Sequence, residues 1–207
     1  MKESPTTHRR YPQVKVTKAQ AQANRTRIVE TAAELFREHG YDGVGVADLM
    51  AAAGLTHGGF YKHFGSKSHL MAEAAACGMT QRLADSRGVD LVDFIHHYLS
   101  REHRDARGAG CTFAALGSDA ARKPDEVKAI FAEGIENSLA AFAPEPAASE
   151  EGRRPDREAM LAAFAGLVGA LVLSRACPDD SPLADEILDA CRKHTLGSLR
   201  AGTGEAP

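Results

Sequence analysis

The stretch VADLMAAAGLTHGGFYKHF, at residues 46–64, decides the fold class of this 207-residue chain. Val46, Leu49 and Met50 lie on one face of a first short helix, and the alanines that follow are small enough for a second helix to cross closely. Gly54 permits a sharp turn between the two helices, since glycine adopts backbone angles that other residues avoid. Phe60 then anchors the second helix in the core. This pattern predicts a helix-turn-helix, and an ordinary corner between two packed helices is the alternative.

The rest of the chain is typical of an all-α protein. Ala, Leu, Glu and Arg dominate and alternating β-branched residues are almost absent, which favours helix between the turn signals. Apolar spacing, glycines and prolines predict about nine helices, at residues 21–39, 46–53, 57–64, 67–85, 91–99, 111–122, 124–142, 156–177 and 182–199. We expect residues 143–155, which are rich in Pro, Glu, Ser and Gly, to form a loop. The predicted domains are a flexible arm (1–20), a three-helix DNA-binding head (21–68) and a helical body (69–202).

Charge is divided unevenly along the chain. Residues 1–71 contain ten Lys and Arg against six Asp and Glu, while the whole chain has a net charge of −3. The remainder therefore carries −7. A basic end on an acidic body is expected when only that end meets the phosphates of nucleic acid.

Composition also excludes several classes of protein. The cysteines are widely spaced and form no CxxC pair, which argues against a disulfide framework or a zinc knuckle. Residues 1–18 lack the apolar segment of a secretory signal, and no run approaches the roughly 18 uninterrupted apolar residues of a membrane span. We therefore expect a soluble cytoplasmic protein with no membrane partner.

If the helix-turn-helix binds DNA, its second helix lies in the major groove and the residues after it hold phosphates. The groove face presents His57, Gly58, Gly59 and Lys62, and the phosphate donors are Tyr61, His63 and Lys67. Such a short module normally works as a pair on two half-sites. We therefore expect a homodimer on palindromic double-stranded operator DNA.

The sequence resembles the TetR family of regulators over about a quarter of its length. The matching residues are 27–29, 32–36, 39–41, 46–49, 53–56 and 58–67, with Leu70, and the Phe-Tyr-x-His-Phe-x-Ser-Lys run among them is specific. The resemblance implies an all-α fold with an N-terminal helix-turn-helix head and a C-terminal helical domain for ligand binding and dimerisation.

The resemblance also implies roles for single residues. Tyr61 and His63 match positions that contact the DNA backbone, and Lys67 matches a lysine that binds a phosphate. Thr56 is expected to cap the recognition helix, whose N-terminus favours phosphate. Arg25 is also among the predicted DNA contacts.

The chain departs from the family pattern at two places. Gly45 is also among the predicted DNA contacts, but it stands where the family usually has Ser or Thr. One phosphate contact is therefore expected to be missing. Gly58 and Gly59 leave the face of the recognition helix nearly bare and weaken it by roughly 1 kcal/mol per added glycine. Base reading is then expected to depend on His57 and Lys62, or on close approach of the backbone.

The second half resembles the family in architecture, which implies a ligand cavity and a four-helix dimer interface formed by the last two helices. The residues expected to hold a small-molecule inducer are Phe94, Ile95, Phe113, Leu116, Ile130 and Phe131. Those expected at the dimer interface are Met160, Phe164, Leu167, Leu171, Ile187 and Cys191. The alternative is that these stripes face the protein's own core.

Cys111 has two interpretations. It follows a stretch, residues 104–110, that is expected to be flexible, and it begins a helix. There the helix dipole, Arg104 and Arg107 would lower the pKa of the thiol and make it reactive. Its sequence surroundings resemble those of family members that sense electrophiles or oxidants through a cysteine. The other interpretation is a small buried hydrophobe, as most free cysteines are, and the other three cysteines are expected in the core.

Neither a metal site nor catalysis is expected. His96, His97 and His103 lie near acidic residues, but their helical register does not bring them to one face. The triplet at residues 103–105 matches that of kinases, yet no DFG and no glycine-rich loop accompany it. We expect no metal, no cofactor and no enzymatic activity.

The sequence therefore predicts a DNA-binding transcriptional regulator, a repressor that a small molecule or an electrophile releases from its operator. The helix at residues 67–85 joins head to body and is expected to carry the signal. One alternative is an activator or a ligand-independent regulator of the same fold. The remote alternative is a helical binding protein or enzyme with a degenerate DNA head. Salt-dependent binding to a palindrome separates these classes.

Overall fold

The computed structural model describes residues 17–142 and 157–203, and all regular structure within them is helical. In chain order the helices are α1 (Lys18–His39), α2 (Val46–Ala52), the 3₁₀-helix η1 (His57–Lys62), α3 (Lys67–Asp85), α4 (Leu91–Tyr98), α5 (Arg101–Asp105), α6 (Thr112–Ala120), α7 (Asp125–Phe142), α8 (Arg157–Ala176) and α9 (Pro182–Thr203). The predicted all-α class is confirmed. The predicted loop at 143–155 and most of the predicted arm lie outside the described residues.

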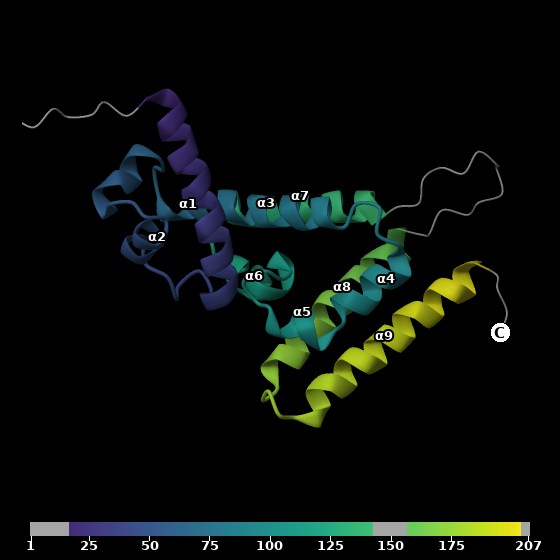
Figure 1. The fold of residues 1–207 in the computed structure, drawn as a ribbon. Helices are drawn as coiled ribbons and strands as arrows, with labels where there is room; N and C mark the ends of the chain where they lie inside the picture. Colours follow the sequence, from purple (N-terminus) through teal and green to yellow (C-terminus); the bar gives the residue numbers. More distant parts are fainter. Residues whose placement is uncertain (1–16, 143–156, 204–207) are drawn as a thin grey trace, which may run out of the picture.

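The molecule has a head at one end of a helical body (Figure 1). α1, α2 and η1 form the head, and α3 leaves the head and runs beside α7. α8 and α9 form an antiparallel hairpin at the other end, and α6 contacts both α1 and α8. Head and body therefore meet at two places, one through α3 and one where α1 touches α6.

Buried hydrophobic residues form two clusters. The first joins the head to α3, α6 and α7, around Phe36 and Leu70. The second joins α4 to α8 and α9, around Ile95 and Leu171. Phe113 of α6 packs against both clusters. A movement of α6 would therefore disturb both halves of the core, because close-packed interiors transmit strain.

The second helix of the helix-turn-helix is shorter and tighter than the sequence indicates. An α-helix is predicted at residues 57–64, whereas η1 is a 3₁₀-helix of six residues. Gly58 and Gly59 add no packing atoms and have low helix propensity, which favours a short, tight turn of chain over a regular α-helix.

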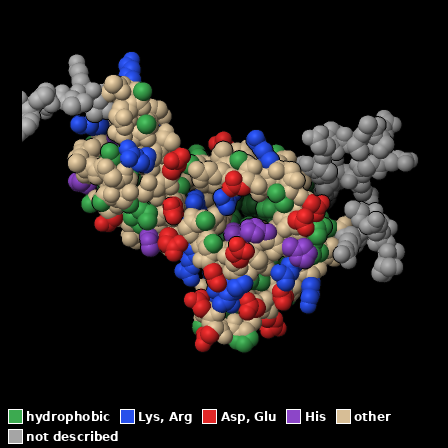
Figure 2. Space-filling view, viewed as in Figure 1, with side chains coloured by type: hydrophobic (Ala, Val, Ile, Leu, Met, Phe, Trp, Pro, Cys, Tyr) green, Lys and Arg blue, Asp and Glu red, His purple; other side chains and the backbone are tan. Residues whose placement is uncertain are grey.

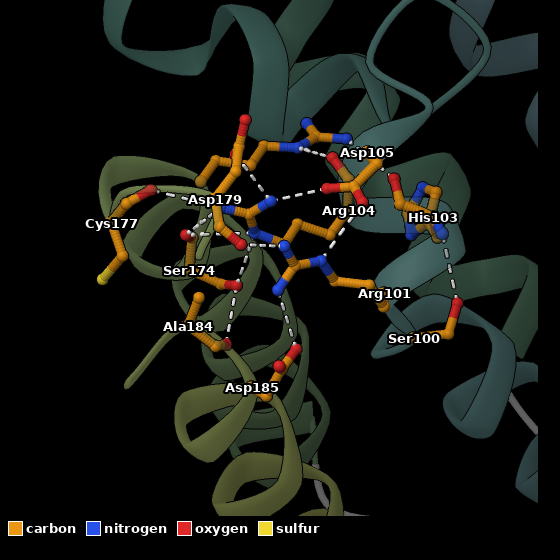
Figure 3. Close-up of polar contacts among 11 residues, drawn as sticks. Ser100, Arg101, His103, Arg104, Asp105, Ser174, Cys177, Asp179, Ala184 and Asp185 are labelled. Atoms are coloured by element: carbon orange, nitrogen blue, oxygen red, sulfur yellow. Dashed lines mark hydrogen bonds and ion pairs between the residues drawn. The ribbon is translucent and has the colours of Figure 1, made fainter. Parts of the chain in front are cut away.

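The stretch at residues 104–110, which the sequence predicts to be flexible, begins inside a short helix, α5. Ser100 caps it, and its Oγ accepts the N–H of His103 at 3.1 Å. Arg104 is 1% exposed; its Nε donates to Ser174 Oγ at 3.1 Å and its Nη1 to Asp179 at 3.0 Å (Figure 3). A guanidinium this deeply buried requires such partners. These bonds fasten α5 to the end of α8, so the expected flexibility is wrong at Arg104.

Candidate nucleic-acid interface

In the head, α2 packs against α1, and η1 packs against α2. Phe36, Leu49 and Phe60 are each at most 1% exposed. Gly54 has a φ of +69°, a region that glycine enters without the strain a side chain would cause, and it turns the chain from α2 into η1. The turn predicted at Gly54 is confirmed, and α2 and η1 together have the arrangement of a helix-turn-helix.

The outer side of η1 carries hydrogen-bond donors. His57, Tyr61 and Lys62 are exposed, and 71% of the Tyr61 surface is accessible. On the inner side, the Phe60 ring is fully buried and stacks on that of Phe64, with 5.6 Å between centroids. The buried ring sets how η1 sits on the head. The outer imidazole, phenol and ammonium can all donate to phosphates or base edges.

Gly58 leaves a gap in this outer side. A Cβ built at Gly58 would meet nothing within 4 Å, whereas one at Gly59 would touch Met50 and Thr56. The bare face predicted for this helix therefore belongs chiefly to Gly58. Thr56 stands at the N-cap position of η1, but its side chain makes no capping hydrogen bond. The capping role predicted for its hydroxyl is wrong.

Two of the predicted DNA contacts have partners within the protein. Lys67 Nζ donates to the carbonyl oxygen of Tyr41 at 2.6 Å, and burial lowers the pKa of Lys67. Arg25 forms an ion pair with Glu73 and lies 4.8 Å from the centre of the Phe64 ring. These contacts hold α1 and the loop after it against α3. Because an ammonium has three N–H donors, Lys67 remains able to bind a phosphate as well.

Gly45 and His63 lie on either side of η1 in the chain. Gly45 is the N-cap residue of α2, and its N–H donates to Asp48 Oδ2 at 3.2 Å. Having no side chain, Gly45 offers no hydroxyl to DNA. His63 directly follows η1 and is half-buried. Among the predicted DNA contacts, the exposed side-chain donors thus lie between Thr56 and Lys62.

An acidic residue of α6 positions the head, and no sequence pattern indicated this role. Asp119 Oδ2 accepts the N–H of Tyr41 at 3.0 Å. Tyr41 is fully buried, and burial raises its pKa. Next to it, Lys123 forms an ion pair with Asp42 at 2.6 Å. The partners lie far apart in the chain and share no periodic pattern, so no local sequence signal pointed to them.

The residues predicted to hold an inducer surround α6. Phe94 and Ile95 come from α4, Phe113 and Leu116 from α6, and Ile130 and Phe131 from α7. They divide between the two hydrophobic clusters. The Phe113 ring lies 5.8 Å from that of Phe131 and 5.1 Å from that of Phe164. Figure 2 shows hydrophobic side chains inside a hollow in the middle of the body, with histidine at its border.

Cys111 is the N-cap residue of α6 and is 9% exposed. Burial lowers the pKa of Arg37 and of Arg175, and the Cys111 thiol opposes that shift in both. The guanidinium groups beside the thiol therefore include these two, whereas the expected Arg104 is directed toward Ser174. The site has the burial expected of a small hydrophobe.

His103 is buried and forms hydrogen bonds with two backbone groups. Its Nδ1 donates to the carbonyl oxygen of Tyr98 at 2.7 Å, and its Nε2 accepts the N–H of Cys111 at 3.2 Å. Burial lowers its pKa. Within residues 17–142 and 157–203, no group of three or more His, Cys, Asp or Glu side chains is placed to hold a metal ion.

The large exposed apolar residues of the α8–α9 hairpin are not those predicted at a dimer interface. Leu171 is 0% exposed within the protomer and belongs to its own core, so its predicted interface role is wrong. The other predicted residues are half-buried: Met160, Phe164, Leu167, Ile187 and Cys191. The exposed ones are Leu161, Val172, Leu173 and Leu183. Because α8 is apolar nearly all round, spacing alone does not separate its inner face from its outer face.

α8 is also long and apolar enough, by length and composition, to cross a membrane. Its most apolar window has a mean hydropathy of 1.8, yet only 17% of that window is buried. In the structure α8 packs against α9, α6 and α5. An apolar helix this exposed indicates a surface that requires a partner.

Residues 28–74 match the sequence model of the bacterial regulatory proteins of the tetR family. The chain is 39% identical over 57 residues to the HTH-type transcriptional regulator AcrR of Shigella flexneri, covering 28% of this chain and 26% of AcrR. It is 29% identical over 183 residues to the HTH-type transcriptional regulator MT0206 of Mycobacterium tuberculosis, covering 78% and 89% of the two chains. A crystal structure of E. coli NemR in its reduced form has the same fold, with a TM-score of 0.65, 17% identity and coverage of 84% and 96%.

A helix-turn-helix head with exposed donors, set on a larger helical body, defines the class of DNA-binding transcriptional regulators. Within that class, the head matches the model of the tetR family of bacterial regulatory proteins over residues 28–74, and the chain shares its fold with the solved structure of NemR.

Proposed function

We propose that the chain is a homodimeric repressor that binds a palindromic operator through η1 and is released from it by a small molecule or an electrophile. The observation that carries the proposal is the row of exposed donors, His57, Tyr61 and Lys62, on the outer side of a head whose core is complete. The basic character of residues 1–71 supports the same partner. In this role the chain is a regulator in the cytoplasm and not an enzyme.

The donors divide between base reading and phosphate binding. Lys62 is able to donate to guanine O6 and N7 in the major groove, and His57 lies at the start of η1. Tyr61, His63 and Lys67 follow toward the phosphates. Gly58 allows the backbone of η1 to approach the groove, because no side chain stands in front of it.

A second copy of the chain is the proposed partner of the α8–α9 hairpin. Leu161 and Leu173 lie on the outer face of α8. Gly166 and Gly169 are in the same helix, and a Cβ at either position would meet nothing within 4 Å. A second helix can therefore approach closely. Two heads joined in this way can occupy half-sites about one helical turn of DNA apart.

The signal is proposed to reach the head through α3, which begins beside η1 and packs against α1, α6 and α7. A ligand held around Phe113, or a modification of Cys111, would displace α6 and through it α3. Such a ligand acts only by binding one arrangement of the heads more tightly than the other. A quinone that releases DNA from the wild-type protein but not from Cys111→Ser would identify the thiol as the trigger. Equal release of DNA from both proteins would exclude the thiol as the trigger and favour a reversible ligand held around Phe113.

Operator binding tests the proposal directly. DNA selected from a random library by the full chain should contain an inverted repeat, and its affinity, measured by fluorescence anisotropy, should fall steeply between about 50 and 200 mM KCl. Lys62→Ala should weaken binding. Lys128→Ala is the matched control, because Lys128 is an exposed lysine of α7 that pairs with Asp125 at 3.1 Å.

The alternatives give other results. Selection of no sequence, or affinity that does not depend on salt, would favour a binding protein with a degenerate head. Selection of an inverted repeat followed by stimulated transcription in vitro from a promoter carrying it would identify an activator in place of a repressor.

A further inference from the structure

A pocket of about 270 Å³ lies where the head meets the body. Three arginines line it: Arg37 from α1, Arg107 from the loop before α6, and Arg175 from α8. One carboxylate, Glu38, is also present, and alanines of α6 and α8 with Val172 form an apolar wall. None of the six residues predicted to hold an inducer borders this pocket. It is therefore a separate site.

The pocket carries an excess of positive charge. Its single carboxylate already accepts a hydrogen bond, since Glu38 Oε2 takes the N–H of Gly108 at 2.8 Å. Among the ion pairs of the described part of the chain, none involves Arg37, Arg107 or Arg175. Three guanidinium groups thus line the pocket against the single carboxylate of Glu38, which leaves an excess of positive charge.

Backbone carbonyls hold two of these arginines in place. Arg37 Nε donates to the carbonyl of Gly108 at 2.7 Å, and Arg175 Nε donates to that of Arg104 at 2.9 Å. The Nη1 atoms of Arg37 and Arg175 are buried and have no hydrogen-bond partner. Arg37 as a whole is only 9% exposed. Arg37 Nη1 is directed at Gly78 and Thr112 inside the protein, so Arg37 contributes fixed positive charge beside the pocket. The exposed Arg107 is the guanidinium that a ligand reaches most directly.

We propose that this pocket binds a small organic anion, a carboxylate or a phosphate ester with a short apolar part. Guanidinium groups pair with both kinds of oxyanion through parallel N–H donors. The wall of Ala114, Ala115, Ala176 and Val172 suits an apolar part and has no polar side-chain atoms. The volume is close to the lower end of ligand pockets, about 300 Å³, which limits the anion to a small molecule.

The position of the pocket links it to DNA binding. Its lining comes from the head, through α1, and from the body, through α6 and α8. Arg37 Nη1 and Thr112 Oγ1 also lie so close to Gly78 of α3 that a Cβ at this glycine would collide with both. An anion bound here would contact both halves of the molecule and alter the angle between them. This second step rests on the proposed function.

The first test is calorimetry on the full chain with three probes: benzoate, phenyl phosphate and the neutral benzamide, at an ionic strength kept constant with KCl. At least one anion should bind and benzamide should not. Arg107→Gln should bind that anion at least about tenfold more weakly. This arginine is exposed, so the substitution leaves the core intact. Arg87→Gln, at another exposed arginine, should bind as the wild type does.

The outcomes separate the two chemistries and can overturn the site. Binding of benzoate alone identifies a carboxylate ligand, and binding of phenyl phosphate alone identifies a phosphate ester. Binding of neither anion, equal binding of benzamide, or unchanged binding by Arg107→Gln would each overturn the site.

The second test measures the operator affinity with and without the saturating anion. The affinity should change by at least about fivefold in the wild type and stay constant in Arg107→Gln. No change in the wild type would overturn the link to the head. A chain that binds the anion in the calorimeter but binds no DNA would contradict the proposed function and leave the anion site standing.

Discussion

The head and the α8–α9 hairpin are both small helical units, but they present opposite surfaces. In the head, the large apolar side chains Phe36, Leu49 and Phe60 are each at most 1% exposed, and the exposed side chains of η1 carry polar groups. In the hairpin, Leu173 and Leu183 are 59% and 52% exposed. The head is complete as a folded unit, whereas the hairpin leaves part of its apolar surface uncovered.

This difference indicates the chemistry of each partner. A unit with a complete core and outward donors suits a polar, charged partner such as DNA. A unit with an uncovered apolar stripe suits an apolar surface, and a second copy of the same stripe is self-complementary in a two-fold dimer. Changes to the two units should therefore have separable effects on stability, on dimerisation and on DNA binding.

The largest effect is expected from Phe60→Ala, which breaks the core of the head. Truncating a fully buried Phe costs about 3–5 kcal/mol. Urea unfolding followed by circular dichroism should show this loss, and operator binding should disappear while the dimer persists. Tyr61→Ala is the control, because a largely exposed side chain contributes within about 0.5 kcal/mol. Dissociation of the Phe60→Ala dimer would show that the two units are not separable.

The next largest effect is expected from Leu173→Arg, which should dissociate the dimer proposed at the α8–α9 hairpin. An unpaired guanidinium placed in a subunit interface costs about 3 kcal/mol or more, so the variant should sediment as a folded monomer. Val89→Arg, at an apolar residue that is 47% exposed outside the hairpin, should remain a dimer. Leu171→Arg should instead lower the free energy of unfolding, because Leu171 is a core residue of the protomer. A dimeric Leu173→Arg would place the interface elsewhere.

A smaller effect is expected from Lys67→Met, which separates the role of Lys67 in the stability of the head from its role in DNA binding. Loss of the bond to the Tyr41 carbonyl should cost about 1 kcal/mol of stability. Loss of a phosphate contact should reduce the salt slope of operator binding by about one unit. Lys62→Met is the control, since an exposed lysine should change DNA binding and leave the free energy of unfolding unchanged. If Lys67→Met is less stable but the salt slope of operator binding is unchanged, Lys67 stabilises the head and does not contact a phosphate.

The smallest effect concerns pH and His103, which lies between the two units. Burial lowers its folded pKa below the usual value of 6.5, so the folded protein keeps the imidazole neutral. As the pH falls below about 6.5, the unfolded chain takes up a proton that the folded chain refuses, and the free energy of unfolding should decrease. Urea unfolding between pH 7.5 and about 5.5 measures this decrease. His103→Gln should flatten it, whereas a change at the exposed His194 should not.

The sequence predicted what depends on neighbours along the chain. The turn at Gly54, the buried Phe60 and the exposed donors around Tyr61 follow from local spacing, and the structure has them. Leu171 and Leu173 are chemically alike and two positions apart, so the pattern of an apolar helix does not indicate which one faces inward. The burial of Arg104 depends on Ser174, 70 residues later in the chain. Contacts of that kind leave no periodic signal.

The two candidate sites, the DNA contacts and the arginine pocket, also differ in how far the sequence predicts them. Most of the predicted DNA contacts lie within one short segment, residues 56–67, and were predicted from it, whereas the support that Asp119 gives to Tyr41 was not. The arginine pocket draws Arg37, Arg107 and Arg175 from three distant parts of the chain. Each is an ordinary charged residue in its own helix or loop, and only the folded arrangement brings them together.

Gly58 gives the head an unoccupied position on its outer side. A Cβ added there would meet no atom of the protein within 4 Å, so a small side chain has room at this position. It would also remove one of two adjacent glycines from the helix, which favours helix formation. In the proposed role, one substitution at this position would change what the head presents to DNA while leaving the buried core of the head as it is.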